Sequence, residues 1–273
     1  MTTPRALTIA GSDSGGGAGI QADLKTFAAL GVHGSSAITA LTAQNTCGVH
    51  GIHDVPAAFV AAQIDAVMED IGADAVKIGM LGRPEVIETV AERLAHWRPR
   101  RVVLDPVMVA KGGDKLLRDE AISALRACLL PSASIVTPNL PEAAVLLNEP
   151  AARDRPGMVE TARRLSTLGP MAVLLKGGHL EGEESPDLLL HEGREVWFEG
   201  VRHATRNTHG TGCTLSSAIA AHLARGMALE PAIAAAKSWL EAAIGAADAL
   251  AIGRGHGPVH HFHGIWRNSE NPS

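Results

Sequence analysis

The chain has 273 residues, of which 46% are hydrophobic and 19% are charged, so it is long enough to bury the core of one α/β domain. Its formal net charge of 24 − 29 = −5 is spread without blocks, which argues against nucleic acid or an anionic membrane as a partner. The 3 cysteines are widely spaced and form no CxxC, which argues against a disulfide framework and favours a cytoplasmic location. We find no pattern typical of a signal peptide or a membrane span.

Apolar runs alternate with amphipathic stretches along the chain. We expect strands at residues 6–11, 35–41, 75–80, 101–107, 133–139 and 171–177. We expect helices near residues 17–30, 56–70, 84–96, 119–129, 141–148, 157–168, 212–225 and 230–250. This alternation predicts a mostly parallel sheet covered by helices on both faces.

Two further features complete the predicted organisation. Two short strand-like runs flank Glu192-Gly193 within residues 187–200, which predicts an antiparallel hairpin near the edge of the sheet. No linker or repeat divides the chain, so residues 1–273 are expected to form a single domain, with residues 1–4 and 267–273 frayed.

Polar residues gather where the predicted strands end, which is where open α/β sheets bind ligands. Gly11-Ser12-Asp13 follows the first strand, Gln44-Asn45 the second and Gly79-Met80 the third. The next three strands are followed by Asp105, Asn139 and Lys176-Gly177. We therefore expect one rim of the sheet to carry the site.

The segment GSDSGGGAGIQADLKTF (11–27) is a glycine-rich turn that leads into a helix. Tight turning and close packing explain its glycines but not Asp13 and Asp23, which flank them. Ile20, Leu24, Phe27 and Ala28 are predicted to form the buried face of the helix. Asp23 lies off that face and is expected to point at the rim.

Two nucleotide-binding motifs are not fulfilled. GAGIQA (17–22) matches G-x-G-x-x-A, but its glycines begin too late after the strand and the second strand ends in TAQNTCG without an acid, which argues against a dinucleotide fold and a dehydrogenase. No GxxxxGK[ST] occurs, and GGDKLL (112–117) has the wrong spacing and no hydroxyl, so a P-loop is excluded.

The segment TPNLPE (137–142) supports two interpretations. Asn139 near a helix start, with Pro141 and Glu142 following, is typical of a capping arrangement. Asp105 ends the preceding strand, so Asp105, Asn139 and Glu142 could also share one Mg²⁺, partly through water.

The segment NTHGTGCT (207–214) is the strongest signal. We expect the backbone N–H groups from Gly210 through Thr211 and Gly212 to Cys213 to form an anion cradle at a helix N-terminus. The helix dipole is expected to lower the pKa of the Cys213 thiol. The alternative is that Cys213 is a small buried residue.

The histidine-rich segment GHGPVHHFH (255–263) has no helical i,i+4 histidine pair and no neighbouring acid. We therefore interpret it as a closing segment folded onto the body of the protein rather than as a metal site.

The ordered motifs LTIAGSD…GGAGIQADLKTF, ITALTAQNT, KIGML, VVLDPVM, TPNLPEA, LLKGGH, NTHGTGCTLS and GPVHHFH together resemble a known family. From about Leu7 to about Trp266 the chain resembles the hydroxymethylpyrimidine/phosphomethylpyrimidine kinases of thiamine biosynthesis, in the ribokinase superfamily. The chain departs from the family at Ser14-Gly15, where Pro or Ser usually precedes Gly-Gly, and this departure bears on the positioning of Asp13.

The resemblance implies a ribokinase-like three-layer α/β/α sandwich and two successive phosphorylations by ATP with Mg²⁺, usually in a homodimer. It implies a pyrimidine site formed by Gly11, Asp23, Gln44, Met80 and Val107. It places the metal near Asp105, Asn139 and Glu142, and the nucleotide near Asn139, Lys176, Thr208 and, more weakly, Lys237. It assigns the transferring phosphoryl group to Thr208 and to Gly210, Thr211, Gly212 and Cys213.

Two alternatives to the two-step kinase stay open at this point. A pyridoxal kinase of the same superfamily also acts on a hydroxymethyl group of a six-membered heteroaromatic ring. A non-catalytic pyrimidine sensor on a kinase fold is a second alternative, against which the intact cradle and its flanking Asp105, Glu142 and Lys176 argue.

Overall fold

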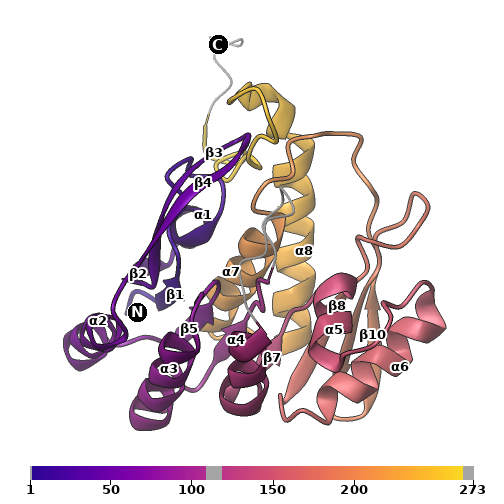
Figure 1. The fold of residues 1–273 in the computed structure, drawn as a ribbon. Coiled ribbons are helices and arrows are strands. Elements are labelled where there is room, and N and C mark those ends of the chain that lie inside the picture. Colours follow the sequence, from indigo (N-terminus) through magenta and orange to yellow (C-terminus); the bar gives the residue numbers. More distant parts are fainter. Residues whose placement is uncertain (1, 109–118, 267–273) are drawn as a thin grey trace.

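A mixed sheet of eight strands lies at the centre of the computed structural model, which describes residues 2–108 and 119–266 (Figure 1). The strand order is β10-β9-β8-β7-β6-β5-β1-β2. Its strands are β1 (Arg5–Ala10), β2 (His33–Ile38), β5 (Ala75–Ile78), β6 (Val102–Leu104), β7 (Ile135–Val136), β8 (Ala172–Lys176), β9 (Asp187–His191) and β10 (Arg194–Phe198). Six strands that are neighbours in the sheet run parallel to one another, as predicted. They are β8, β7, β6, β5, β1 and β2.

The hairpin at the edge of the sheet is confirmed. β9 is antiparallel to both β8 and β10. Glu192 and Gly193 connect β9 to β10 with positive φ angles of 52° and 75°. Positive φ at both central residues is the geometry of a type I′ turn, whose twist matches that of the two strands it joins.

A second, two-stranded sheet was not predicted. β3 (Ala40–Asn45) pairs antiparallel with β4 (Gly48–Asp54), so the predicted strand 35–41 is divided between β2 and β3. Gln44 therefore lies on β3 and does not follow a strand of the central sheet. Most of β4 is exposed, so its residues show no alternation of apolar and polar side chains that would identify a strand.

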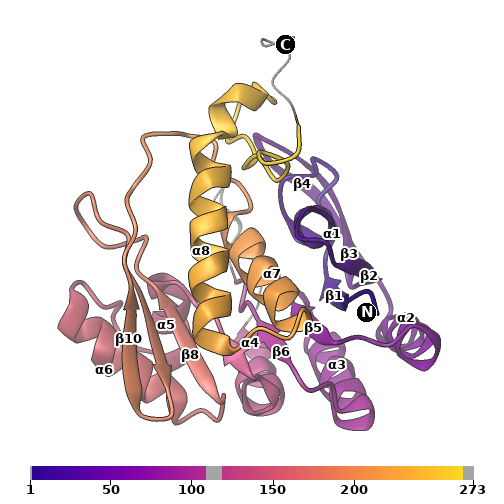
Figure 2. The same ribbon diagram turned by 180° about the vertical axis from the view of Figure 1, so that it is seen from behind.

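Helices cover both faces of the central sheet and confirm the three-layer prediction. The helices are α1 (Gly19–Ala29), α2 (Ala57–Asp70), α3 (Pro84–Trp97), α4 (Asp119–Ala124), α5 (Leu140–Leu147), α6 (Arg155–Ser166), α7 (Thr211–Ala224) and α8 (Leu229–Gly245). A π-helical turn (Leu125–Leu129) and a short 3₁₀ helix (Leu130–Ser132) extend α4, and another 3₁₀ helix (Ala247–Leu250) follows α8. Figures 1 and 2 show α2 to α6 on one face and α1, α7 and α8 on the other.

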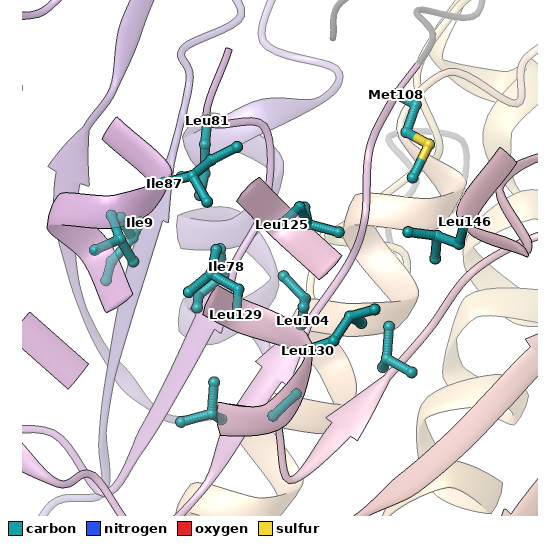
Figure 3. Packing of buried hydrophobic residues seen from close by; sticks show 14 of the residues in the cluster. Ile9, Ile78, Leu81, Ile87, Leu104, Met108, Leu125, Leu129, Leu130 and Leu146 are labelled. Atoms are coloured by element: carbon teal, nitrogen blue, oxygen red, sulfur yellow. The ribbon is translucent and has the colours of Figure 1, made fainter. Parts of the chain in front are cut away.

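Each face of the sheet has its own apolar core. On the α2 to α6 side, Ile78 and Leu104 of the sheet pack with Ile87, Leu125 and Leu129 (Figure 3). On the other side, residues of α7 and α8 form much of the core, and the alanines among them allow the two helices to approach each other closely. No helix in the described ranges is long and apolar enough to cross a membrane.

The helix α1 differs from its prediction. Ile20 and Phe27 are buried as expected, but Ala28 is exposed and Asp23 is completely buried. A pattern of apolar residues cannot show that a carboxylate will be buried, because burial of Asp requires a partner from elsewhere in the chain.

The histidine-rich segment closes onto the body, as predicted. Val259 joins the core on the α7 side, and the His260 N–H donates to the Ala243 carbonyl at 2.9 Å. His261 lies 3.1 Å from Thr214 Oγ1, and burial lowers its pKa to about 3, so the ring is neutral. Within the described ranges, no group of three His, Cys, Asp or Glu residues could hold a metal ion.

Two predictions concern the ends and one loop of the chain. The predicted fraying of residues 1–4 does not extend to Pro4, whose carbonyl accepts a hydrogen bond from His33 N–H at 2.9 Å. Residues 267–273 and the GGDKLL segment (112–117) lie outside the described residues.

Candidate active site

A cavity of about 570 Å³ opens at the carboxyl ends of the parallel strands. β1 lies between β2 and β5 in the sheet, so the strand order reverses direction at β1. In open α/β sheets such a reversal leaves a crevice in which ligands bind. All the predicted site residues line this cavity except Asp23 and Lys237. Those that do are Gly11, Gln44, Met80, Asp105, Val107, Asn139, Glu142, Lys176, Thr208, Gly210, Thr211, Gly212 and Cys213.

Two glycine-rich segments from opposite ends of the chain meet at the cavity. Gly210 has a φ of 79° and precedes the first residue of α7, and a Cβ atom there would collide with the carbonyl oxygen of Gly17. The two backbones are therefore in direct contact, and both the φ angle and the contact require glycine. No described side chain caps α7, although the Thr211 N–H donates to the Thr208 carbonyl at 3.4 Å. Anion binding by the N–H groups of this first turn stays a prediction.

The buried carboxylate of Asp13 organises the first of these segments. It accepts hydrogen bonds from the backbone N–H groups of Gly15 (2.8 Å), Gly17 (3.0 Å) and Ala18 (2.8 Å). Ser14 Oγ lies 2.8 Å from both the backbone nitrogen and the carbonyl oxygen of Gln44, which ties the turn to β3. The turn that contains Ser14 and Gly15, where the chain departs from the family pattern, is thus held by hydrogen bonds to Asp13 and to Gln44.

The opposite wall of the cavity carries a cluster of charges. Lys176 Nζ lies 3.1 Å from Asp105 Oδ1 and 3.9 Å from Glu142 Oε2. Burial raises the pKa of Glu142 to about 7, and Asp105 adds to the rise while Lys176 opposes it. Burial lowers the pKa of Lys176, but the attraction of Asp105 and Glu142 is larger and leaves it raised. An ammonium and two carboxyl groups therefore face the same space.

The capping interpretation of TPNLPE is confirmed as local structure. Asn139 Oδ1 accepts from the Glu142 N–H at 2.8 Å, and Glu142 Oε2 accepts from the Asn139 N–H at 2.8 Å, which together form a capping box at the start of α5. Each side-chain oxygen retains a second lone pair, so the cap does not exclude metal binding, which stays a prediction.

The predicted lowering of the Cys213 pKa is wrong. Burial raises the pKa of the Cys213 thiol to about 11, and the nearby Asp23 and Asp105 add to the rise. Lys77 and a backbone hydrogen bond oppose it without offsetting it. The helix dipole contributes at most about 2 kcal/mol, less than the loss of hydration can cost a buried thiolate. The thiol is therefore neutral near pH 7.

The prediction that Asp23 points at the rim is also wrong. Its carboxylate is completely buried, and each of its two oxygens lies 2.9 Å from Lys77 Nζ. The hydroxyl groups of Thr8 and Ser217 each donate to it at 2.6 Å. Lys77 lines the floor of the cavity and was missed by the sequence reasoning, although a lysine within the apolar run AVKIGM was a signal that a buried acid must pair with it.

Lys237 does not reach the cavity. Its ammonium group lies 2.7 Å from Asp187 Oδ2 and 2.7 Å from the Ser185 carbonyl, so it secures the start of β9. Asp187 also accepts from the Gly177 N–H at 3.0 Å. Lys237 was expected, more weakly than Lys176, on the nucleotide side, but its anionic partner is instead a carboxylate of the protein.

His209 and Thr42 line the cavity and were also missed. His209 Nε2 lies 2.8 Å from Asp13 Oδ2 and 3.3 Å from Gln44 Nε2. His209 is part of the NTHGTGCT motif, but its contacts with Asp13 and Gln44, 196 and 165 positions away, cannot be inferred from local spacing.

Comparison with known proteins gives a consistent picture. The profile of the family described as phosphomethylpyrimidine kinase matches residues 13–260. A hydroxymethylpyrimidine/phosphomethylpyrimidine kinase of Salmonella typhimurium is 55% identical over 266 residues, which cover 97% of this chain and 100% of that protein.

Two solved structures are similar over most of the chain. A phosphomethylpyrimidine kinase from Clostridium difficile is 44% identical with a TM-score of 0.78, over 86% of this chain and 97% of that one. An ADP complex of Bacillus subtilis pyridoxal kinase is 37% identical with a TM-score of 0.88, over 96% of this chain and 98% of that one.

Proposed function

Because the chain belongs to the phosphomethylpyrimidine kinase family, we propose that it phosphorylates 4-amino-5-hydroxymethyl-2-methylpyrimidine with ATP and then phosphorylates the resulting monophosphate to the diphosphate. These are steps of thiamine biosynthesis. One observation supports the proposal most directly: the anion cradle at the start of α7 opens into the same cavity as the amide of Gln44. A phosphoryl group and a heteroaromatic ring can therefore be held together.

We assign the ring to the part of the cavity formed by Gly11, Gln44, Met80 and Val107. A Cβ atom at Gly11 would collide with the end of the Met80 side chain, so glycine allows Met80 to lie across this part of the cavity. Met80 and Val107 supply apolar contacts, and the Gln44 amide supplies a donor and an acceptor for the ring edge.

The phosphate groups are assigned to the opposite part. The N–H groups of Gly210 to Cys213 and the Thr208 side chain would hold the transferring phosphoryl group, and Lys176 would neutralise its charge. A Cβ atom at Gly212 would lie 3.3 Å from Lys176 Nζ and 3.6 Å from Asp105 Oδ2, so the cradle and the charged cluster border the same small space.

The donor set beside this space fits Mg²⁺ with ATP. Asp105 and Glu142 provide carboxylate oxygens and Asn139 an amide oxygen, which are the ligand types that Mg²⁺ takes in proteins. When bound, the ion neutralises charge that develops on the phosphate oxygens. Asp105, Asn139 and Glu142 would hold the ion beside the phosphate groups, partly through water.

Cys213 is assigned to the hydroxyl group that is phosphorylated. At neutral pH its thiol carries its proton, so it adds no negative charge next to the phosphate of the second substrate. Phosphoryl transfer depends mainly on positioning and charge neutralisation, so a weak base at this position is compatible with turnover.

Mass spectrometry of the products formed from ATP, Mg²⁺ and hydroxymethylpyrimidine tests the proposal. We expect the monophosphate to appear first and the diphosphate to follow. A second candidate is a pyridoxal kinase, which the structural similarity to the Bacillus subtilis enzyme favours. Efficient turnover of pyridoxal together with failure to phosphorylate the pyrimidine monophosphate would support that candidate instead.

Replacing Gln44 tests the assignment of the ring. We expect Gln44→Ala to raise the KM for the pyrimidine about 10-fold or more and to leave the KM for ATP nearly unchanged, because ring polar groups then lose their partners at about 1–3 kcal/mol. Steady-state kinetics with each substrate varied in turn measures both constants. An equal rise in both would indicate a structural role for Gln44.

The cellular setting and the assembly are part of the same proposal. We expect the enzyme to work in the cytoplasm as a homodimer, which light scattering of the purified protein can measure directly.

A further inference from the structure

We propose that His209 is a positioning residue that sets the orientation of the Gln44 side-chain amide, and with it the pattern of donors and acceptors that a substrate ring must match. The inference rests on the proposed function, because it concerns the ring edge assigned to Gln44. A continuous series of hydrogen bonds in the cavity wall carries the argument. Its members are Asp13, His209, Gln44, Thr42 and Ser12.

One end of the series determines where His209 carries its hydrogen. The Asp13 side chain is buried, and its Oδ2 atom accepts from two backbone N–H groups and lies 2.8 Å from His209 Nε2. Burial alone raises the pKa of Asp13, but the hydrogen bonds from His209 and from the turn outweigh it and leave the pKa below its usual value. An ionised carboxylate only accepts hydrogen bonds, so His209 Nε2 must bear a hydrogen and donate it.

The other end determines the role of Thr42. Thr42 Oγ1 lies 2.9 Å from the carbonyl oxygen of Ser12, which can only accept. The single hydroxyl hydrogen of Thr42 is therefore directed at Ser12. Toward Gln44, which lies 3.3 Å away, Thr42 Oγ1 can offer only a lone pair.

Both ends require the same orientation of the Gln44 amide. His209 Nε2 has no lone pair, so an amide nitrogen facing it would set two donors against each other. An amide oxygen there can instead share, in a three-centre bond, the hydrogen that Nε2 donates to Asp13. Thr42 presents a lone pair, so the amide atom facing Thr42 must be the nitrogen. In the structure the nitrogen lies 3.3 Å from His209 Nε2 and the oxygen 3.3 Å from Thr42 Oγ1. A half turn of the terminal amide exchanges the two atoms with almost no other movement, and hydrogen-bond networks are the basis for assigning it.

Gly17 explains why the imidazole of His209 is held in one place. A Cβ atom at Gly17 would collide with Cδ2 of His209, so the ring lies directly against the glycine backbone. The backbone N–H of His209 donates to the Gly257 carbonyl at 3.0 Å, which fixes the main chain that carries the ring. With only 13% of its side chain exposed, His209 is restrained from both sides and keeps the amide from turning freely.

The held amide presents one pattern to a ligand. A primary amide has two acceptor sites on its oxygen and two N–H donors, and the protein uses one of each. One acceptor and one donor remain on adjacent atoms. A 4-aminopyrimidine edge, with a ring nitrogen acceptor beside an exocyclic amine donor, matches them in one orientation. The 4-oxo analogue presents a ring N–H donor beside a carbonyl acceptor, which reverses the pattern.

The test compares kcat/KM for the first phosphorylation of the 4-amino substrate and its 4-oxo analogue in each enzyme. In His209→Leu, which lacks the donor, we expect the preference for the amino substrate to fall about 10-fold, the equivalent of one hydrogen bond of about 1.4 kcal/mol. In His209→Gln, an amide N–H can replace Nε2–H, and we expect the preference to stay within about 3-fold of the parent. The ratio is independent of how much of a preparation is folded.

An unchanged preference in His209→Leu, or an equal loss in His209→Gln, would overturn the inference. A second measurement needs no substrate: ¹⁵N NMR of the histidines in the parent enzyme should show a hydrogen on His209 Nε2, and a bare Nε2 would also overturn it. If the parent enzyme phosphorylates neither pyrimidine, the proposed function fails, while the NMR result still decides the hydrogen-bond arrangement.

Discussion

At the scale of single residues, Cys213 combines a reactive side chain with a setting that keeps it protonated. It lies in the first turn of α7, where the dipole favours a thiolate, yet burial raises its pKa to about 11. The first phosphorylation requires removal of a proton from an alcohol, whereas in the second the attacking phosphate oxygen is already anionic. The thiolate form of Cys213, a minor fraction at neutral pH, would accept the alcohol proton in the first step, and the neutral thiol that predominates does not repel the phosphate in the second.

Replacement of Cys213 should therefore affect the two steps differently. We expect Cys213→Ala to slow the first phosphorylation about 10²-fold or more and the second much less, because only the first step needs a base. We expect Cys213→Asp to keep some alcohol kinase activity and to lose the second step through repulsion. Measuring both rates separately in both variants checks this. Equal losses at the two steps would leave Cys213 as a packing residue of the cradle.

The raised pKa of Cys213 predicts slow alkylation. Since only the thiolate reacts, a rise of the pKa from 9.0 to about 11 should slow iodoacetamide labelling near pH 7 about 100-fold relative to an unperturbed thiol. The rate should increase about 10-fold per pH unit as the pH rises toward 11. Mass spectrometry can follow each cysteine, and the exposed Cys47 serves as a control within the same molecule. Labelling of Cys213 as fast as Cys47 at pH 7 would contradict the prediction.

At the scale of elements, the start of α5 has a structural task and a proposed chemical one. The capping box satisfies two backbone N–H groups, while Glu142 and Asp105 are assigned to Mg²⁺. The two tasks use different properties of the same side chains: capping needs a hydrogen-bond acceptor, whereas metal binding needs negative charge. Variants can therefore separate them.

We expect Asn139→Ala to lower the free energy of unfolding by about 1 kcal/mol in urea titrations, because the cap is lost, and Asn139→Asp to retain it. Glu142→Gln keeps an acceptor oxygen, so its stability should stay within about 0.5 kcal/mol of the parent. Glu142→Gln and Asp105→Asn should each raise the Mg²⁺ concentration needed for half-maximal rate about 10-fold. If Mg²⁺ titrations of both variants match the parent, TPNLPE has only its capping role.

At the scale of the whole molecule, one buried ion pair joins four elements beneath the cavity. Asp23 of α1 pairs with Lys77 of β5 and accepts hydrogen bonds from Thr8 of β1 and Ser217 of α7. Ser217 lies one turn beyond Cys213, so the pair helps to hold the cradle over the sheet. Both charged side chains are fully buried, and each is tolerated there only because of the other.

Breaking this pair on one side should be costly. We expect Lys77→Met to lower the free energy of unfolding by about 3–5 kcal/mol, because the Asp23 charge stays buried without a counter-ion. The double variant Lys77→Met/Asp23→Asn should lose less than Lys77→Met alone, since no charge remains to be stabilised. Urea denaturation of the parent, both single variants and the double variant gives the coupling. A double variant that loses the sum of the single losses would show that the two charges act independently.

The sequence by itself determined the layered α/β fold, the edge hairpin and most of the cavity wall. These follow from local signals: apolar periodicity marks the strands and helices, and parallel strands bring their carboxyl ends to one edge. The residues there, such as Asp105, Asn139 and Gly210, therefore converge without any knowledge of long-range contacts. The exposed β3–β4 pair escaped prediction because it has no such periodicity.

Only the tertiary structure decided which charged groups face the cavity and which face one another. Asp23 and Lys237 turn away from it because Lys77 and Asp187, distant in sequence, offer buried partners. His209 enters the wall because Asp13 receives it, 196 positions earlier in the chain. The pKa of Cys213 depends on how far the fold withdraws its half-buried thiol from water, which outweighs the helix dipole that the local sequence supplies. Burial and pairing depend on the surroundings in space, so local spacing could not predict them.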